Sequence, residues 1–438
     1  MSEAFDMVKQ SPASSRDLTQ LFQTIDNFTC DRQSIPQEKL DLNGKSRTSI
    51  FPWRGQFSPQ LVEVFLNYYA EEKSVIFDPF VGSGTTLFES ARKGLTCYAA
   101  EINPAAVAMA KSVNFVNLNL PRRQKIIEAT NSIVTESLRP FEWNLFSYQQ
   151  QNQVFVLKNN NSKYNFLATL IQKNKQNCAI HNLLVNAAIR YDSNYLNQEI
   201  TYLQKAVYEQ SKIITSLPFS KQKYQLFHQD ARKVSLPNNS VDLIITSPPY
   251  INVFNYHQNN RQIMEALGWD LLKIAKSEIG SNRKNRQNRF LTVIQYALDM
   301  LDVFQEMRRL LCPHGRAIIV IGRESKVRRM KINNTRIIAA LALGSGTFKL
   351  DIIQERKFKN KFGEVIYEDI LHLIPTSLEI TDGDEFARLV GQWILQEIKP
   401  KAERKVLQEI VNAQERANLV KKSPIFELTD DYLTANFT

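Results

Sequence analysis

Short apolar runs separated by longer amphipathic stretches organise most of this chain of 438 residues. The runs are short and continuous, which suits strands buried on both faces of a parallel sheet. They cover residues 74–77, 95–100, 224–227, 241–246 and 316–322. A last pair of runs, 348–355 and 367–373, flanks the turn Lys361-Phe362-Gly363 and predicts a hairpin. The pattern therefore predicts an α/β fold whose mostly parallel sheet ends in an antiparallel edge pair.

The stretches between these runs carry helix start and stop signals. Ser58 suits an N-cap and Pro59 the first helical position. The apolar residues that follow share one helical face: Leu61, Val62, Phe65 and Leu66. Further helices are expected from Thr85 to a C-cap at Gly94, from Asn103-Pro104 to Lys111, and over 303–311 before a turn at Gly315.

The alternation breaks off from about 112 to 225, where long polar helical stretches rich in Asn, Gln and Lys appear. Residues 126–138 and 196–214 are examples. We interpret this part as a helical insertion into an α/β core. The expected divisions are a polar, partly ordered segment 1–48, core segments 49–111 and 226–375, the insertion 112–225, and a helical segment 376–438.

The C-terminal segment shows one hydrophobic stripe at helical spacing, which predicts packing against the core. The stripe consists of Phe386, Leu389, Val390, Trp393 and Ile394. Residues beyond 400 are charged, so we expect them to be solvated.

Charge adds a candidate partner to this picture. The formal net charge is +11 and the pI is near 9.3, so nucleic acid is the first polyanion to consider. The four cysteines are far apart and make neither a CxxC pair nor a zinc spacing, which suits a reducing, cytoplasmic setting. We see neither a signal peptide nor an apolar run of bilayer length, and we expect no membrane partner.

The first chemical motif is a glycine loop between a strand and a helix. Asp78 ends the strand, and Gly82 and Gly84 allow a sharp turn that brings backbone N–H groups close to a ligand. Glu101 ends the next strand, about 20 positions after the loop, where a carboxylate can accept the hydroxyls of a ribose.

The second motif is Ser247-Pro248-Pro249-Tyr250, at the end of the 241–246 strand. Two prolines fix a rigid turn that presents a hydroxyl, a carbonyl and an aromatic ring. A hydroxyl and a carbonyl can accept both N–H bonds of an exocyclic amine while a ring stacks on the base.

Together the two motifs resemble those of S-adenosylmethionine-dependent DNA methyltransferases that modify exocyclic amines. The resemblance implies a Rossmann-like class I methyltransferase fold with a seven-stranded sheet, and S-adenosylmethionine as the cofactor. It implies that the DPFxGSGTT loop, the F-x-P helix start and the acidic residues after the second and third strands hold that cofactor. The matching positions are Phe57, Ser58, Pro59, Asp78, Pro79, Phe80, Gly82, Ser83, Gly84, Thr85, Thr86, Glu101, Asn103 and Asp230.

The catalytic motif of the family falls on Ser247, Pro248, Pro249 and Tyr250. The resemblance implies that a flipped base is held by the Ser247 hydroxyl and the Pro248 carbonyl, stacks on Tyr250, and is methylated without a metal or a covalent intermediate. Serine at the first position favours cytosine N4. Adenine N6, an RNA amine and an inactive DNA-binding homologue are the alternatives. A separate restriction endonuclease is a common partner in the family, and this chain carries no nuclease motif.

Two regions are candidates for target recognition on double-stranded DNA: the insertion, and the segment from Tyr250 to about 295. The second includes a basic run, and another basic cluster follows the 316–322 strand; both suit contacts to phosphates. The candidate DNA-binding residues are Arg283, Lys284, Arg286, Arg289, Arg323, Lys326, Arg328 and Arg329.

Overall fold

The computed structural model describes residues 15–42, 48–53, 55–141, 157, 159–251, 256–280, 287–359, 363–376, 383–428 and 437. Arg283, Lys284 and Arg286 lie outside this described part, as does the predicted turn at Lys361-Phe362.

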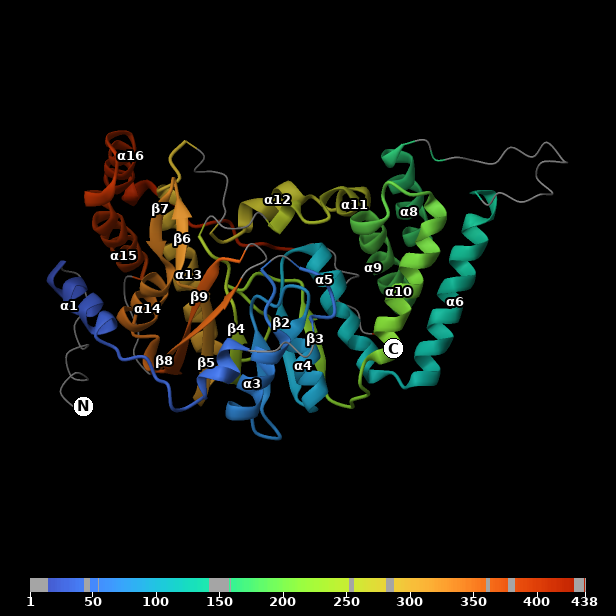
Figure 1. Ribbon diagram of the computed structural model, residues 1–438, viewed down its shortest axis with the longest axis horizontal. Coiled ribbons are helices and arrows are strands. Elements are labelled where there is room, and N and C mark those ends of the chain that lie inside the picture. Colours follow the sequence, from blue (N-terminus) through green and yellow to red (C-terminus); the bar gives the residue numbers. More distant parts are fainter. Residues whose placement is uncertain are drawn as a thin grey trace.

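A seven-stranded sheet forms the centre of the described chain, in the order β3-β2-β1-β4-β5-β9-β8 (Figure 1). Strands β1 to β5 pair in parallel, whereas β9 is antiparallel to both β5 and β8. The strands are β1 (Val75–Asp78), β2 (Thr96–Ala100), β3 (Tyr224–Phe227), β4 (Val241–Thr246), β5 (Leu311–Gly322), β8 (Phe348–Lys359) and β9 (Val365–Pro375). This confirms the predicted α/β fold, with a mostly parallel seven-stranded sheet and an antiparallel edge hairpin.

Side chains that alternate along the strands divide the core into two clusters, one on each face of the sheet. Ile76 belongs to the cluster under the first set of helices, and its neighbour Phe77 belongs to the other cluster. The first set is α3 (Pro59–Tyr69), α4 (Thr85–Lys93) and α5 (Pro104–Lys111). The opposite face is covered by α13 (Leu291–Leu310), α14 (Asn334–Gly344) and α15 (Gly383–Ile398). Because both faces are covered, the strands read as continuous apolar runs.

Two boundaries on this second face differ from the prediction. Helix α13 begins at Leu291, twelve positions before the expected start, and residues 291–301 are all buried, so no amphipathic period marks that stretch. Strand β5 already begins at Leu311 and passes through Gly315, so the predicted turn at Gly315 is wrong. The register of β5 against β4 shifts there, and a Cβ on Gly315 would lie 2.9 Å from the Asp242 carbonyl oxygen. The glycine therefore permits a bulge inside the strand.

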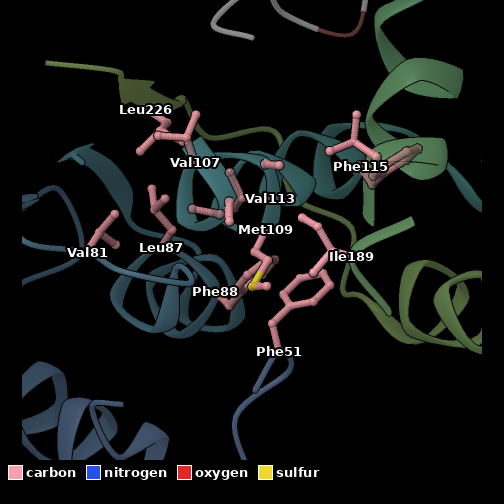
Figure 2. Close-up of a cluster of buried hydrophobic side chains, with 14 of the residues drawn as sticks. Phe51, Val81, Leu87, Phe88, Val107, Met109, Val113, Phe115, Ile189 and Leu226 are labelled. Carbon is pink, nitrogen blue, oxygen red and sulfur yellow. The ribbon is translucent and has the colours of Figure 1, made fainter. Parts of the chain in front are cut away.

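The predicted insertion is helical and consists of α6 (Leu120–Leu138), α8 (Asn160–Lys173), α9 (Cys178–Asn194) and α10 (Leu203–Ser216). It shares the core of the sheet domain. Figure 2 shows Ile189 of α9 in one apolar cluster with Met109 of α5 and Phe51. Asn182 and Asn186 of α9 also donate to the carbonyl oxygen of Ala108, at 2.8 and 2.9 Å, inside α5. Both apolar packing and hydrogen bonds thus fix the insertion to the core.

A buried arginine strengthens this junction. Arg123, on the first turn of α6, is 2% exposed, and its guanidinium donates to five carbonyl oxygens. The acceptors belong to Val116, Leu118, Ile214, Leu217 and Pro218, so one side chain joins the entry to α6 to the exit from α10.

The two ends of the chain pack on the core more fully than their polarity indicates. Helix α1 (Ser15–Asp26) buries Leu18 and Phe22, and Phe22 stacks on Trp393 at 5.5 Å. Helix α16 (Arg404–Glu415) buries Ile410. The expectation that residues beyond 400 are solvated therefore holds for most of the charged side chains but not for the apolar positions of α16, which pack on the core. Apart from short 3₁₀ helices, the remaining described elements are α2 (Gln37–Asp41), α11 (Arg261–Ala266), α12 (Leu271–Ser277), β6 (Glu324–Val327) and β7 (Met330–Asn333).

Contacts between residues that are far apart in the sequence explain why this end of the chain packs on the core. Arg232 donates to the carbonyl oxygens of Ser423 and Pro424, and Asp299 accepts from the backbone and hydroxyl of Ser423. These contacts hold the extended segment 423–428 against the core, and local pattern cannot reveal them. Within the described residues, no helix is both long enough and apolar enough to span a membrane.

Replacing Arg123 with alanine should lower the free energy of unfolding by about 3 kcal/mol or more, because five buried carbonyl groups lose their donor. Urea unfolding measures the change. The neighbouring exposed residue gives the control: Arg122→Ala should change stability by no more than about 0.5 kcal/mol. Equal effects of the two substitutions would show that the carbonyl cage contributes nothing.

Candidate active site

A cleft opens at the carboxyl ends of β1, β2 and β4, with about 870 Å³ of space not filled by atoms and open to solvent. That is the edge at which an open α/β sheet holds its ligands. The cleft is lined by residues of every motif that the sequence singled out, namely Phe57, Pro79, Phe80, Gly82, Ser83, Thr85, Glu101, Asn103, Asp230, Ser247 and Pro249. The two motifs, which are far apart in the sequence, therefore face one shared space.

Asp78 lies behind the wall of this cleft and joins its two sides. Its carboxylate is 1% exposed and accepts hydrogen bonds from the hydroxyls of Thr86 and Thr246, both at 2.6 Å, and from the backbone N–H of Phe80 at 3.0 Å. Burial raises the pKa of Asp78 to about 6, against the lowering effect of these donors. The carboxylate is thus a structural link between the glycine loop and the strand that carries Ser247.

The glycine loop depends on backbone conformations that other residues rarely adopt. Gly82 has φ +55° and Gly84 has φ +100°. The ring of Trp53 lies against Gly82, within 3.2 Å of where a Cβ would be. A Cβ on Gly84 would lie 2.9 Å from the Cα of Ala110 in α5. The loop is therefore pressed between α5 on one side and Trp53 on the other.

Glu101 lines the cleft and receives three backbone N–H groups. Its Oε1 accepts from Ile102 at 2.9 Å and from Asn103 at 2.8 Å, and its Oε2 accepts from Gly82 at 3.0 Å. Burial raises the pKa of Glu101 to about 7, the three N–H donors oppose the rise, and the nearby Asp78 adds to it. A carboxylate has about four acceptor positions, so one position on Oε2 stays available to a ligand.

Asn103 also lines the cleft, and its side chain caps helix α5 and bonds to the backbone of Tyr256. Its Oδ1 accepts from the N–H groups of Ala105 and Ala106 at the start of α5, and its Nδ2 donates to the Tyr256 carbonyl at 3.0 Å. The Tyr256 ring stacks on Trp53, with centroids 6.4 Å apart. Asn103 therefore places an aromatic pair beside the glycine loop.

Asp230 lines the cleft, and its carboxylate is engaged by the protein. Its four acceptor positions are filled, by the backbone, Nε and Nη2 of Arg232 and by the backbone N–H of Phe426. Asp230 contributes to the wall of the cleft, but its carboxylate is committed to the protein. The side chain cannot accept from a cofactor amine unless one of these bonds is broken.

The catalytic motif divides between the cleft and the core. Ser247 and Pro249 line the cleft, Pro248 is buried behind them, and the ring of Tyr250 packs against Gly322. Among the predicted cofactor residues, Ser58 and Pro59 lie at the start of α3, and Gly84 and Thr86 are buried and do not line the cleft. Ser58 stands at the N-cap position, although its side chain makes no capping bond.

Half of the residues that line the cleft were not predicted from the sequence, among them Trp53, Gln56, Tyr256 and Glu278. Gln56 donates to the Ser83 hydroxyl at 3.1 Å, and Glu278 accepts from the backbone and Nδ1 of His257. The sequence marks these residues only by their proximity to the two motifs. Proximity alone does not tell which residues line the cleft and which belong to the core.

The predicted DNA-binding residues have different surroundings. Arg323 is held by Asp369 at 2.5 Å and by Glu355 at 2.8 Å, so two carboxylates compensate its charge. Arg328 pairs with Glu409 at 3.2 Å, and Arg289 is half-buried. Lys326, Arg328 and Arg329 are exposed on the hairpin β6–β7, which follows the carboxyl end of β5.

The two candidate recognition regions lie in contact. Tyr164 of α8 donates to Gln262 of α11 at 2.8 Å, and Asn260 donates to Ser193 of α9 at 2.9 Å. Figure 1 shows α12 and α11 between hairpin β6–β7 at one end and the helical insertion at the other. The segment after Tyr250 and the insertion therefore form one continuous structure beside the cleft.

Comparisons with known proteins agree with the sequence motifs. The family model described as DNA methylase, of the N6/N4 methyltransferase group, matches residues 9–112. Type II methyltransferase M.MjaII from Methanocaldococcus jannaschii is 36% identical over 90 residues, which is 20% of this chain and 17% of that protein. Type II methyltransferase M.AvaI from Nostoc sp. is 24% identical over 356 residues, 66% of each chain.

Solved structures with some likeness include a SAM-dependent methyltransferase from Methanosarcina mazei, at 9% identity and a TM-score of 0.31, covering 72% of this chain and 98% of that one. Another is the rRNA methyltransferase AviRa from Streptomyces viridochromogenes, at 10% identity and a TM-score of 0.29, covering 82% of this chain and 98% of that one.

Gly84→Ala should lower the free energy of unfolding by about 3 kcal/mol, because a left-handed backbone and a collision with the Ala110 backbone act together. Gly94→Ala is the matched control. It has φ +66° with open space around its Cβ, so only the conformational cost of about 1 kcal/mol applies. Thermal unfolding compares them; equal losses would contradict the close approach at Gly84.

Proposed function

Because the chain is related to the DNA methylases of the N6/N4 group, we propose that it is a site-specific DNA methyltransferase. The methyl group passes from S-adenosylmethionine to the N4 amine of cytosine within a short DNA sequence. Adenine N6 is the alternative target. The matches span 17% and 66% of the two relatives, so this assignment rests on the site as much as on similarity.

One observation carries the proposal: Ser247 and Pro249 line the same cleft as the glycine loop and Glu101. A methyl donor held by the loop and an amine held by the serine would meet there. Had the two motifs opened on different faces, neither could serve transfer, because the reacting atoms must approach to about 3–3.5 Å.

The lining residues fit the cofactor. Glu101 keeps an acceptor position on Oε2 for a ribose hydroxyl, and the loop 79–85 brings backbone close to the cleft. Trp53 and Tyr256 provide aromatic surface beside the loop. When bound, S-adenosylmethionine would supply a methyl group on a positively charged sulfur. Transfer to the amine would leave the cofactor as a neutral thioether and release one amine proton to water.

The residues Ser247 to Tyr250, which we call the proline corner, would then hold the base. Ser247 Oγ and the Pro248 carbonyl accept hydrogen bonds from the exocyclic amine, which keeps the nitrogen lone pair out of the ring and raises its nucleophilicity. Tyr250 provides an aromatic face for the flipped base. Most of the rate gain in this scheme comes from positioning, because the methyl group is already activated. Serine at position 247 supports cytosine, since the resemblance links this residue to N4 methylation.

DNA would lie across the carboxyl edge of the sheet, where the exposed residues Lys326, Arg328 and Arg329 on β6–β7 can contact phosphates. The insertion and the α11–α12 segment, which are joined by hydrogen bonds, form the proposed recognition region. We propose that the chain acts in the cytoplasm and only modifies DNA, with cleavage left to a separate restriction endonuclease.

Cofactor affinity should rise with pH through about 7, because Glu101 has a pKa near 7 and only its ionised form offers the full set of acceptor positions. As the pH falls below 7, the carboxyl group gains a proton and affinity should fall by up to about tenfold per pH unit. Calorimetric titration at pH 6 to 8 measures this. Glu101→Gln should bind more weakly at pH 8, and the difference between the two curves isolates Glu101; identical curves would exclude it from the ribose site.

Ser247→Ala should reduce methyl transfer about a hundredfold while cofactor affinity stays unchanged, because one acceptor for the amine is lost and the loop is untouched. DNA from cells that express each protein is digested to nucleosides and analysed by mass, and modification-sensitive sequencing locates the site. N4-methylcytosine in the wild type supports the proposal. N6-methyladenine would correct the base, and labelled methyl in RNA alone would overturn the DNA assignment.

A further inference from the structure

The side chains of Ser247, Tyr250 and Glu368 form a hydrogen-bonded series that leads from the cleft to strand β9. The Tyr250 Oη lies 3.4 Å from Ser247 Oγ and 3.3 Å from Oε1 of Glu368. Glu368 is on β9, directly paired with Gly322 of β5. A Cβ on Gly322 would lie 2.7 Å from the Tyr250 ring, so the glycine makes room for the ring beside the sheet. Glu368 and Gly322 lie outside the Ser247–Tyr250 motif, so the series extends the motif into the sheet.

Counting protons fixes the direction of this series. Oε2 of Glu368 accepts from Nε of Arg356 at 2.7 Å, so Glu368 faces Tyr250 as a carboxylate that only accepts. Burial raises the pKa of Tyr250, and Glu368 adds to the rise, so the hydroxyl keeps its proton at neutral pH. Tyr250 has one proton and donates it to Glu368. In its contact with Ser247 it must therefore accept, and Ser247 must donate.

This direction decides what Ser247 presents to the cleft. A serine hydroxyl carries one rotatable proton and two lone pairs, so an isolated serine can donate or accept. Once its proton is engaged by Tyr250, Ser247 Oγ offers only lone pairs, which suit an amine that has N–H groups to donate. A carboxylate at this position would not need to be oriented in this way, because it carries no proton and can only accept.

We propose that Glu368 is a positioning residue that acts through Tyr250 to orient the Ser247 hydroxyl as an acceptor for the target amine. The inference rests on the proposed function, since it concerns how the amine is held. Arg356 supports it by fixing the carboxylate from behind. Glu368 itself does not touch the substrate.

The test compares Tyr250→Phe, Glu368→Gln and the double variant. Tyr250→Phe keeps the ring and removes the link, so kcat should fall about tenfold to a hundredfold, while KM for DNA and cofactor affinity stay near wild type. Glu368→Gln should do the same, because an amide facing Tyr250 can donate and reverse the direction of the series. The double variant should be no slower than Tyr250→Phe alone, since Glu368 acts only through that hydroxyl.

Asp351→Asn provides the control, because Asp351 is a carboxylate of the same hairpin paired with Arg316 at 2.8 Å, and it does not line the cleft. It should keep the wild-type kcat. Multiplying losses in the double variant, or a higher KM with unchanged kcat, would overturn the role of Glu368. Should Glu368→Gln unfold the chain, Tyr250→Phe alone decides, and an unchanged kcat contradicts the proposal.

The outcome for the wild type separates this inference from the proposed function. Methyl transfer by the wild type with unaffected variants refutes only the positioning role. A wild type that binds the cofactor but transfers methyl to no DNA refutes the proposed function, and the inference with it.

Discussion

The buried carboxylate of Asp78 is the contact on which the cleft depends. It receives Thr86 from the first turn of α4, Phe80 from the glycine loop, and Thr246 from the last position of β4. Thr246 directly precedes Ser247, so a single side chain links the loop and the proline corner. Burying a carboxylate is unfavourable, as its pKa of about 6 reflects, and the three donors offset part of that cost. Because Asp78 of β1 is bonded to Thr246 of β4, the carboxyl ends of these two strands cannot shift independently.

The order of the strands explains why so long an insertion leaves the cleft intact. β1 lies between β2 and β4, so the three strand ends that form the cleft are neighbours. The insertion enters after α5 and returns at β3, which is the outer strand and pairs only with β2. Closing a longer loop costs little extra entropy. Arg123 then joins the entry to α6 with the exit from α10, and the asparagines of α9 fix the insertion to α5.

Local pattern predicted the parts of the fold that are set by local chemistry. The strand and helix bounds around Asp78, Gly94 and Asn103 were confirmed, because turn glycines and caps act within a few residues. The start of α13, the bulge at Gly315 and the packing of segment 423–428 were not predicted. The start of α13 lies in a stretch that is buried on every side, so no amphipathic period marks it. The other two depend on partners more than 70 residues away: Gly315 on Asp242 of β4, and Ser423 on Arg232 and Asp299. No period in the sequence reports such a partner.

Glu101 and Asp230 show why a motif position does not by itself assign a role. Both are acidic residues at the end of a strand, and both contribute to the cleft. Glu101 receives three backbone N–H groups and keeps a position on Oε2, whereas Asp230 spends all four positions on Arg232 and Phe426. The unfilled acceptor position, which only the folded chain reveals, separates a carboxylate that has room for a further donor from one whose positions are all filled by the protein. By that criterion Asp230 belongs with Asp78: it shapes the cleft by holding the protein around it.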